Sequence, residues 1–195
     1  MIFCIFGLPR AGKTTLATAI AQKNLVGKSM LGIPVHPHVF TNFYCKGCNK
    51  INFDEIAYYD YSDSLIIIDE ISLHADNRDF KTFSKELLEF FKLHGHYHID
   101  IIWISQSNSD ADKKIRDITD TVYLVERSRI PFHSVVKKIY HNFSFANRQI
   151  TDTYDLAPRL EWQYINLRKY FKYFDSYAKS EKICLHQPEF QKWGD

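Results

Sequence analysis

A glycine-bracketed loop near the amino end holds the residues best suited to chemistry. Residues 7–14 read Gly-Leu-Pro-Arg-Ala-Gly-Lys-Thr, which fits the Walker A pattern G-x-x-x-x-G-K-[ST]. Glycines without a Cβ let the backbone wrap closely around a phosphate chain. The lysine offers a positive charge to the β- and γ-phosphates, and the threonine hydroxyl is placed to ligate Mg²⁺. We predict that ATP and Mg²⁺ bind here, with contacts from Gly7, Leu8, Pro9, Arg10, Ala11, Gly12, Lys13, Thr14 and Thr15.

A second candidate site follows an apolar run, Leu65-Ile66-Ile67-Ile68, which ends in Asp69 and Glu70. This is the Walker B pattern, in which an acid at the carboxyl end of a strand helps to hold Mg²⁺. We assign that metal role to Asp69. The adjacent Glu70 could accept a proton from a water molecule that attacks the γ-phosphate, which favours hydrolysis over phosphoryl transfer to another acceptor. The alternative is a strand that simply ends in two solvated acids.

Further polar residues could complete the catalytic site. Gln106 ends another apolar strand, where its side chain could hydrogen-bond the γ-phosphate or the attacking water. Four arginines are candidates for a charge-stabilising finger, although most arginines are ordinary surface residues. We favour Arg116, because it falls on a short helix just beyond the Gln106 strand; the others are Arg78, Arg127 and Arg129.

Alternating strands and helices must position these residues. The apolar patterns predict strands at 2–6, 39–43, 65–70, 99–106 and 121–125, and helices at 15–22, 80–93 and 110–118. Continuous apolar strands need cover on both faces, and alternation with helices implies a parallel sheet with right-handed crossovers. We therefore predict an α/β P-loop NTPase fold with a mostly parallel, helix-flanked sheet of the additional-strand ATPase type.

Length and composition set limits on this interpretation. The chain has 195 residues, enough for one sizeable core. We expect residues 1–130 to form the ATPase core and residues 131–195 to elaborate the same domain, beginning with an antiparallel ribbon over 133–145. The net charge of +2 is too small to indicate nucleic-acid binding by itself. Because no apolar run approaches the ~18–20 residues of a membrane span, we expect a soluble chain.

Two other patterns are ambiguous. Cys45 and Cys48 have zinc-ligand spacing, and His36 and His38 lie upstream. An extended strand over residues 39–43, at ~3.3 Å per residue, would keep the two pairs apart, so we favour a turn with two thiols. Near the carboxyl end, lysines interleave with aromatic residues over 169–182. Such a segment could stack bases and contact phosphates, or pack against the core; we favour packing.

Taken in order, several of these stretches resemble the zonula occludens toxin N-terminal family. This family includes the assembly and export ATPases of filamentous bacteriophages and is distantly related to FtsK/HerA-type DNA translocases. Besides the Walker motifs, the resemblance involves Val39 to Asn42, Leu93 to Gln106, Asp112 to Arg116 and the closing motif Tyr170 to Ser176. It covers about residues 1–180. Family members usually continue into a membrane-spanning helix, whereas this sequence stops at Asp195, so the resemblance leaves membrane attachment open.

The resemblance implies an ATP-hydrolysing motor at the cytoplasmic face of the bacterial inner membrane, which assembles and exports single-stranded DNA phage. Its partners would be phage DNA or coat and assembly proteins, and a membrane-anchored assembly partner. We expect a ring, with six subunits as the favoured number. No arginine near the motifs is obviously placed to reach its own γ-phosphate, so we expect Arg116 to reach the neighbour's. The alternatives are a viral genome-packaging ATPase, a nucleotide-dependent switch or scaffold with little turnover, and a small-molecule kinase.

Overall fold

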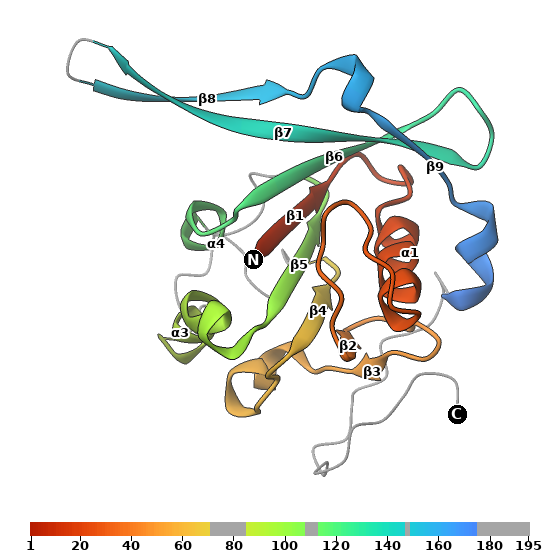
Figure 1. Cartoon of the computed structure of the whole chain (residues 1–195), viewed down its shortest axis with the longest axis vertical. Helices are drawn as coiled ribbons and strands as arrows, with labels where there is room; N and C mark the ends of the chain where they lie inside the picture. The colour runs from red at the N-terminus through yellow and green to blue at the C-terminus, as the bar shows by residue number, and fades with distance from the viewer. Residues whose placement is uncertain (71–84, 108–112, 147–148, 175–195) are drawn as a thin grey trace.

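One mixed β-sheet organises the computed structural model, which describes residues 1–70, 85–107, 113–146 and 149–174 (Figure 1). Its order is β3-β2-β4-β5-β1-β6-β7-β8, and β9 pairs with β7. The strands are β1 (Ile2–Phe6), β2 (His38–Thr41), β3 (Asn49–Lys50), β4 (Ser64–Ile68), β5 (Asp100–Ser105), β6 (Thr121–Arg127), β7 (His133–Ala146), β8 (Gln149–Leu156) and β9 (Gln163–Asn166). The α-helices are α1 (Lys13–Leu25), α3 (Lys85–Leu93) and α4 (Lys113–Asp117). The 3₁₀ helices are η1 (Phe53–Tyr58), η2 (His94–Tyr97), η4 (Arg159–Glu161) and η5 (Arg168–Tyr173).

The first half of the sheet is parallel, as predicted. The loop-bearing strand β1 pairs in parallel with β5 on one side and β6 on the other, and β4 pairs in parallel with β5. Strand β5 thus lies between β1 and the acid-bearing β4, which is the additional strand of the predicted fold type. Because parallel strands end at the same edge, the residues that follow β1, β4 and β5 meet there.

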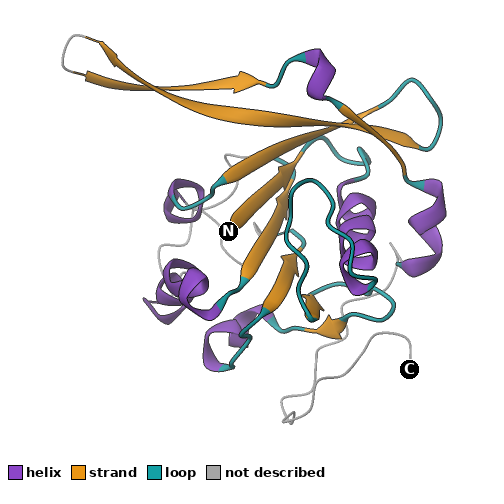
Figure 2. Ribbon diagram, in the orientation of Figure 1, coloured by secondary structure: helices purple, strands orange, loops and turns teal. Residues whose placement is uncertain are grey.

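Helices cover both faces of this parallel region (Figures 1 and 2). The alanine-rich helix α1 buries Leu16, Ala17 and Ile20 against one face. On the other face, α3 contributes Leu87 and Phe91 to the second core cluster, and α4 contributes a buried isoleucine. Every residue of β4 and β5 is buried, as expected for central strands with cover on both sides. The part of the predicted 80–93 helix before residue 85 lies outside the described residues.

Beyond β6 the chain turns antiparallel. Strand β7 pairs antiparallel with β6 and with β8, and β9 returns to pair with the first part of β7. The predicted antiparallel pairing over 133–145 is found, but these residues form a single strand, and the ribbon extends to β8. The β7–β8 hairpin extends past the helix-covered part of the sheet (Figure 1). These strands continue the sheet that β1 begins; the domain division at residue 130 stays a prediction.

The cysteine pair forms a buried turn. The Cys48 amide donates to the Cys45 carbonyl at 3.0 Å, and the two Sγ atoms are 3.2 Å apart. The His36 ring lies elsewhere, with Nε2 2.8 Å from a carboxylate oxygen of Asp100. In the part of the chain that the structure describes, no cluster of three His, Cys, Asp or Glu side chains could hold a metal ion. Cys184 lies outside the described residues.

Two further observations concern the helices. His94 closes α3, with Nδ1 2.7 Å from the Phe91 carbonyl oxygen. Burial lowers the pKa of this histidine. Among the described residues, no helix has both the length and the apolar character needed to cross a membrane.

Candidate functional site

The loop after β1 winds tightly because two glycines let other backbone and side-chain atoms approach it. A Cβ on Gly7 would lie 2.2 Å from the Val125 carbonyl oxygen. A Cβ on Gly12 would lie 2.4 Å from Leu167 Cδ1 and 2.8 Å from Ser134 Oγ. At Gly7 the contact is with backbone that cannot move aside, so packing requires glycine there. At Gly12 the contacts are with the ends of side chains, and the left-handed backbone, with φ 96°, is what favours glycine.

Lys13 lies over this loop. Its ammonium group donates to the carbonyl oxygens of Gly7 at 2.8 Å and Leu8 at 3.2 Å. Burial lowers the pKa of Lys13, while the nearby charges of Asp69 and Glu70 act in the opposite direction. The lysine is thus held beside the amino end of α1, where backbone N–H groups and the helix dipole favour an anion.

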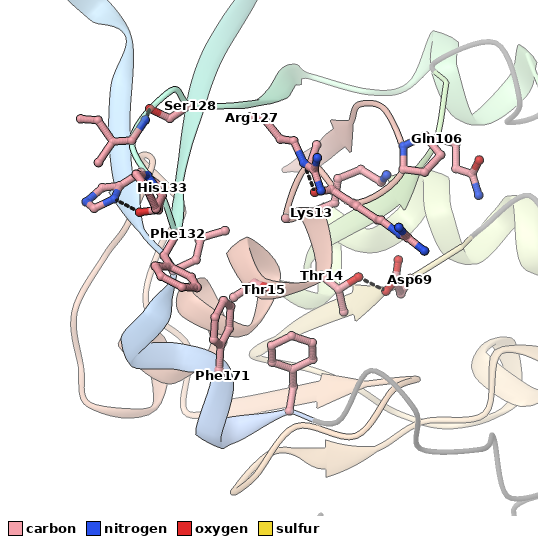
Figure 3. A pocket seen from close by; sticks show the side chains of 18 of the residues that line it. Lys13, Thr14, Thr15, Asp69, Gln106, Arg127, Ser128, Phe132, His133 and Phe171 are labelled. Atoms are coloured by element: carbon pink, nitrogen blue, oxygen red, sulfur yellow. Dashed lines mark hydrogen bonds between the residues drawn. The ribbon is translucent and has the colours of Figure 1, made fainter.

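The first residue after β4 meets the loop directly. The Thr14 hydroxyl donates to a carboxylate oxygen of Asp69 at 2.7 Å (Figure 3). Burial raises the pKa of Asp69, and the hydrogen bond from Thr14 partly opposes that rise. A hydroxyl and a carboxylate are hard oxygen ligands of the kind that Mg²⁺ prefers. The two predicted metal ligands therefore lie together, and their chemistry fits the ion.

Asn42, at the end of β2, holds Asp69 in place. Its side-chain amide donates to the Asp69 carbonyl at 3.0 Å, and its side-chain oxygen accepts from the Asp69 amide at 2.7 Å. In the sequence, Asn42 belongs to a stretch that resembles the family, and no role is predicted for it. One feature of the sequence could have indicated this role: Asn42 is a polar residue directly after a strand that ends at the same sheet edge as β4.

Glu70 and Gln106 lie beside these residues, and both line the same cavity. The Glu70 backbone is left-handed, with φ 51°, and its amide donates to Asp69 Oδ1 at 2.9 Å. Left-handed backbone is strained in a residue that carries a Cβ, and such strain often occurs at functional sites. Gln106 follows β5 as predicted and lies on the Asp69 side of the cavity (Figure 3).

The cavity is about 880 Å³ in volume and lies at the carboxyl edge of the parallel strands. Of the predicted loop residues, Pro9 to Thr15 line it, together with Asp69, Glu70 and Gln106. Gly7 and Leu8 contribute the carbonyl groups that Lys13 contacts. The predicted loop, metal and base residues are thus brought to one site. Their chemical roles stay predictions.

Of the candidate finger arginines, Arg127 lies at the cavity, whereas the favoured Arg116 does not. Arg127 lines the cavity, and its Nε donates to the Arg10 carbonyl at 3.1 Å. Strand β6 runs two residues further than predicted and ends at Arg127, which brings this candidate finger to the chain's own cavity. The role of each arginine stays a prediction, and Arg78 lies outside the described residues. Arg116 does not line the cavity. It lies on α4, which leads into the amino end of β6 (Figure 1).

Most of the chain matches a known protein family. The family model described as zonular occludens toxin matches residues 46–181, which is more than two thirds of the chain. The match begins after the Walker A loop, so the loop is separate evidence. No curated protein sequence matches the chain.

A solved structure shares the fold of this chain. The N-terminal domain of zonular occludens toxin from Neisseria meningitidis has a TM-score of 0.59 at 16% identity, covering 89% of this chain and 98% of that one. The genome packaging NTPase B204 from Sulfolobus turreted icosahedral virus 2, in complex with ATP-gammaS, has a TM-score of 0.48 at 14% identity, covering 70% and 91%. The predicted fold class is confirmed.

Asn42 provides a direct test of how the acid is positioned. In Asn42→Asp, the side chain can no longer donate to the Asp69 carbonyl and adds a second negative charge. We expect the Mg²⁺ concentration for half-maximal nucleotide binding to rise by about 10-fold or more, the usual effect of losing an outer-shell partner of a metal ligand. Gln163→Glu, at an exposed position of β9 outside the cavity, is the control for added charge. An unchanged Mg²⁺ requirement in Asn42→Asp would contradict the positioning role.

Proposed function

The chain belongs to the zonular occludens toxin family, and from this membership and the geometry of its loop we propose that it is a Mg²⁺-dependent ATPase. The observation that carries the proposal is the hydrogen bond between Thr14 and Asp69 beside the Lys13 ammonium. A lysine, a hydroxyl and a carboxylate at the start of a helix are the set that a nucleoside triphosphate and its metal require.

In this proposal each group has a defined task. The backbone amides at the amino end of α1 and the Lys13 ammonium bind the phosphate chain. Thr14 and Asp69 hold Mg²⁺, with Asn42 keeping the acid in position. Bound Mg²⁺ neutralises charge on the β- and γ-phosphates. Arg127 adds positive charge from the chain's own β6.

Glu70 is the proposed general base. It lines the cavity next to the metal acid, and a carboxylate there can take a proton from water. Gln106, on the neighbouring strand, would orient that water. A protein that only switches on nucleotide binding has little need for such a base, so Glu70 favours turnover.

The wider role follows from the family resemblance. We propose that the ATPase drives assembly and export of single-stranded DNA phage particles from the cytoplasmic side of the bacterial inner membrane. Phage DNA or coat and assembly proteins would be its cargo, and a membrane-anchored assembly protein its partner. Residues 1–130 would form the ATPase core. Residues 131–195 would elaborate the same domain, which is supported by the continuous sheet from β6 into β7 and β8.

We further propose that the active form is a ring, with a hexamer as the favoured size. Arg116 does not line its own chain's cavity, so it can contribute to catalysis only at a neighbour's. Arg116 is only partly buried in the single chain, which leaves part of the residue available to a neighbouring subunit.

The nucleotide-binding claim is tested by two substitutions. Lys13→Ala should weaken ATP binding, because the loop loses its only side-chain ammonium in the motif. Thr14→Ala should weaken only the Mg²⁺-dependent part of ATP binding. Thr14→Ser, which keeps the hydroxyl, should bind MgATP like the parent chain. Isothermal titration calorimetry with and without Mg²⁺ measures both effects, with Lys28→Ala on the exposed loop as control. Unchanged nucleotide affinity in both variants would refute the central claim.

The general base is tested by Glu70→Gln. This variant should still bind ATP but release phosphate at least ~10²-fold more slowly, the usual size of a general-base effect. Gln106→Ala should slow hydrolysis with a smaller loss of binding. Glu55→Gln, away from the cavity, should hydrolyse like the parent chain. Normal phosphate release by Glu70→Gln would move the base to another residue.

Mixing experiments separate the two arginines. Arg116→Ala and Arg127→Ala should each lower turnover, by up to ~10³-fold for a finger residue. Mixing Arg116→Ala with Lys13→Ala should restore some activity, because some interfaces then pair an intact loop with an intact Arg116. Mixing Arg127→Ala with Lys13→Ala should restore none, because neither chain has a complete cavity. Phosphate release per subunit should fall on dilution; activity that stays constant down to monomer concentrations would contradict the shared site.

A further inference from the structure

The half of the cavity away from Asp69 is aromatic. Phe132, in the turn between β6 and β7, is 55% exposed, and Phe171 on η5 is 44% exposed. Both line the cavity, and their ring centroids are 6.2 Å apart at an interplanar angle of 70°. In Figure 3 these rings lie beside Thr15, on the side of the cavity opposite Gln106. The cavity therefore has a polar end suited to phosphates and an aromatic end without an assigned role.

The aromatic end is attached directly to the phosphate loop. The Leu167 amide donates to the Phe132 carbonyl at 2.8 Å, and Leu167 Cδ1 packs against Gly12. The Ser134 hydroxyl donates to the Ala11 carbonyl at 2.6 Å. A triphosphate with its γ end at Asp69 would run along the loop toward Thr15. Its nucleoside would then leave the loop where the two rings lie.

The cysteine turn is bonded to the residues that follow Phe171 in the chain. The Lys46 amide donates to the Tyr173 carbonyl at 2.8 Å, and Gln22 of α1 donates to the Lys46 carbonyl at 2.6 Å. A β-bridge joins Cys45 to Phe174. These contacts tie η5 to helix α1, so the segment is positioned before any ligand arrives, which lowers the ordering cost of binding.

Phe132 has an unfavourable backbone for its type. Its φ is 60°, a left-handed conformation that is an outlier for a bulky residue. The ring is more than half exposed, so burial in the core does not compensate for this strain. Strained residues of this kind cluster at ligand-binding sites.

We propose that Phe132 and Phe171 form a shelf for the base of the bound nucleotide: because the rings are 70° apart in orientation, one stacks on the base through its face and the other contacts the base through its edge. Aromatic side chains stack on nucleobases through their faces, and a cavity of 880 Å³ is within the range of small-molecule sites. This proposal rests on the proposed ATPase function and adds the residues that hold the base. It also gives two neighbours in the closing aromatic motif different roles. Tyr170 is buried in the fold, whereas Phe171 lines the cavity.

The test compares a ligand that has a base with one that lacks it. Competition binding gives the affinities of MgATP and Mg-tripolyphosphate for the parent chain, Phe171→Ala and Phe132→Gly. We expect ATP affinity to fall about 10-fold in each variant, as for loss of a base–aromatic stack, with tripolyphosphate affinity unchanged. Phe132→Gly should not lower the melting temperature, because glycine accepts the left-handed backbone. Tyr58→Ala, an exposed aromatic residue outside the cavity, is the matched control.

Two outcomes would overturn the shelf. One is unchanged ATP affinity in both phenylalanine variants. The other is an equal loss for ATP and tripolyphosphate, which would mean that the rings act only by supporting the loop. Lys13→Ala separates this failure from failure of the ATPase proposal, because it should weaken both ligands whether or not the shelf exists.

Discussion

The hydrogen bond between Thr14 and Asp69 is the contact on which the site depends. It joins two residues that are 55 positions apart in the sequence. It forms because β5 pairs with both β1 and β4, so that the loop after one strand faces the acid after the other. Asn42 reinforces this arrangement from β2 by bonding the Asp69 backbone on both sides. The sheet order thus determines which polar groups can share a metal ion.

Although the β7–β8 hairpin extends beyond the helix-covered sheet, other segments in the second half of the chain complete the cavity. Arg127 ends the last parallel strand, the next turn contributes Phe132, and the segment after β9 brings Leu167 and Phe171 over the loop. These residues come from regions whose sequence carries no Walker motif. The same region of the chain that differs most from a minimal α/β domain therefore closes the candidate nucleotide site.

The two glycines of the loop have a structural reason beyond phosphate contact. Gly7 lies against the Val125 carbonyl and Gly12 against Leu167, so β6 and the closing segment press on the loop from outside. A side chain at Gly7 would collide with the β6 backbone, and one at Gly12 would displace the Leu167 side chain. The loop, β6 and the segment after β9 therefore pack as one unit, and a shift in one of them would change the packing of the other two.

The sequence alone determined the loop, the acid-bearing strand, the parallel sheet and the family. These rest on local signals, since a glycine pattern or a continuous apolar strand can be recognised without knowing its neighbours. The pairing of Asn42 with Asp69, the placement of Arg127 in the cavity and the aromatic end of the pocket were decided only by the tertiary structure. Each depends on which strand ends meet at one edge, and on how far β6 runs. Residues far apart in sequence acquire these contacts through strand order and packing, which no local pattern encodes.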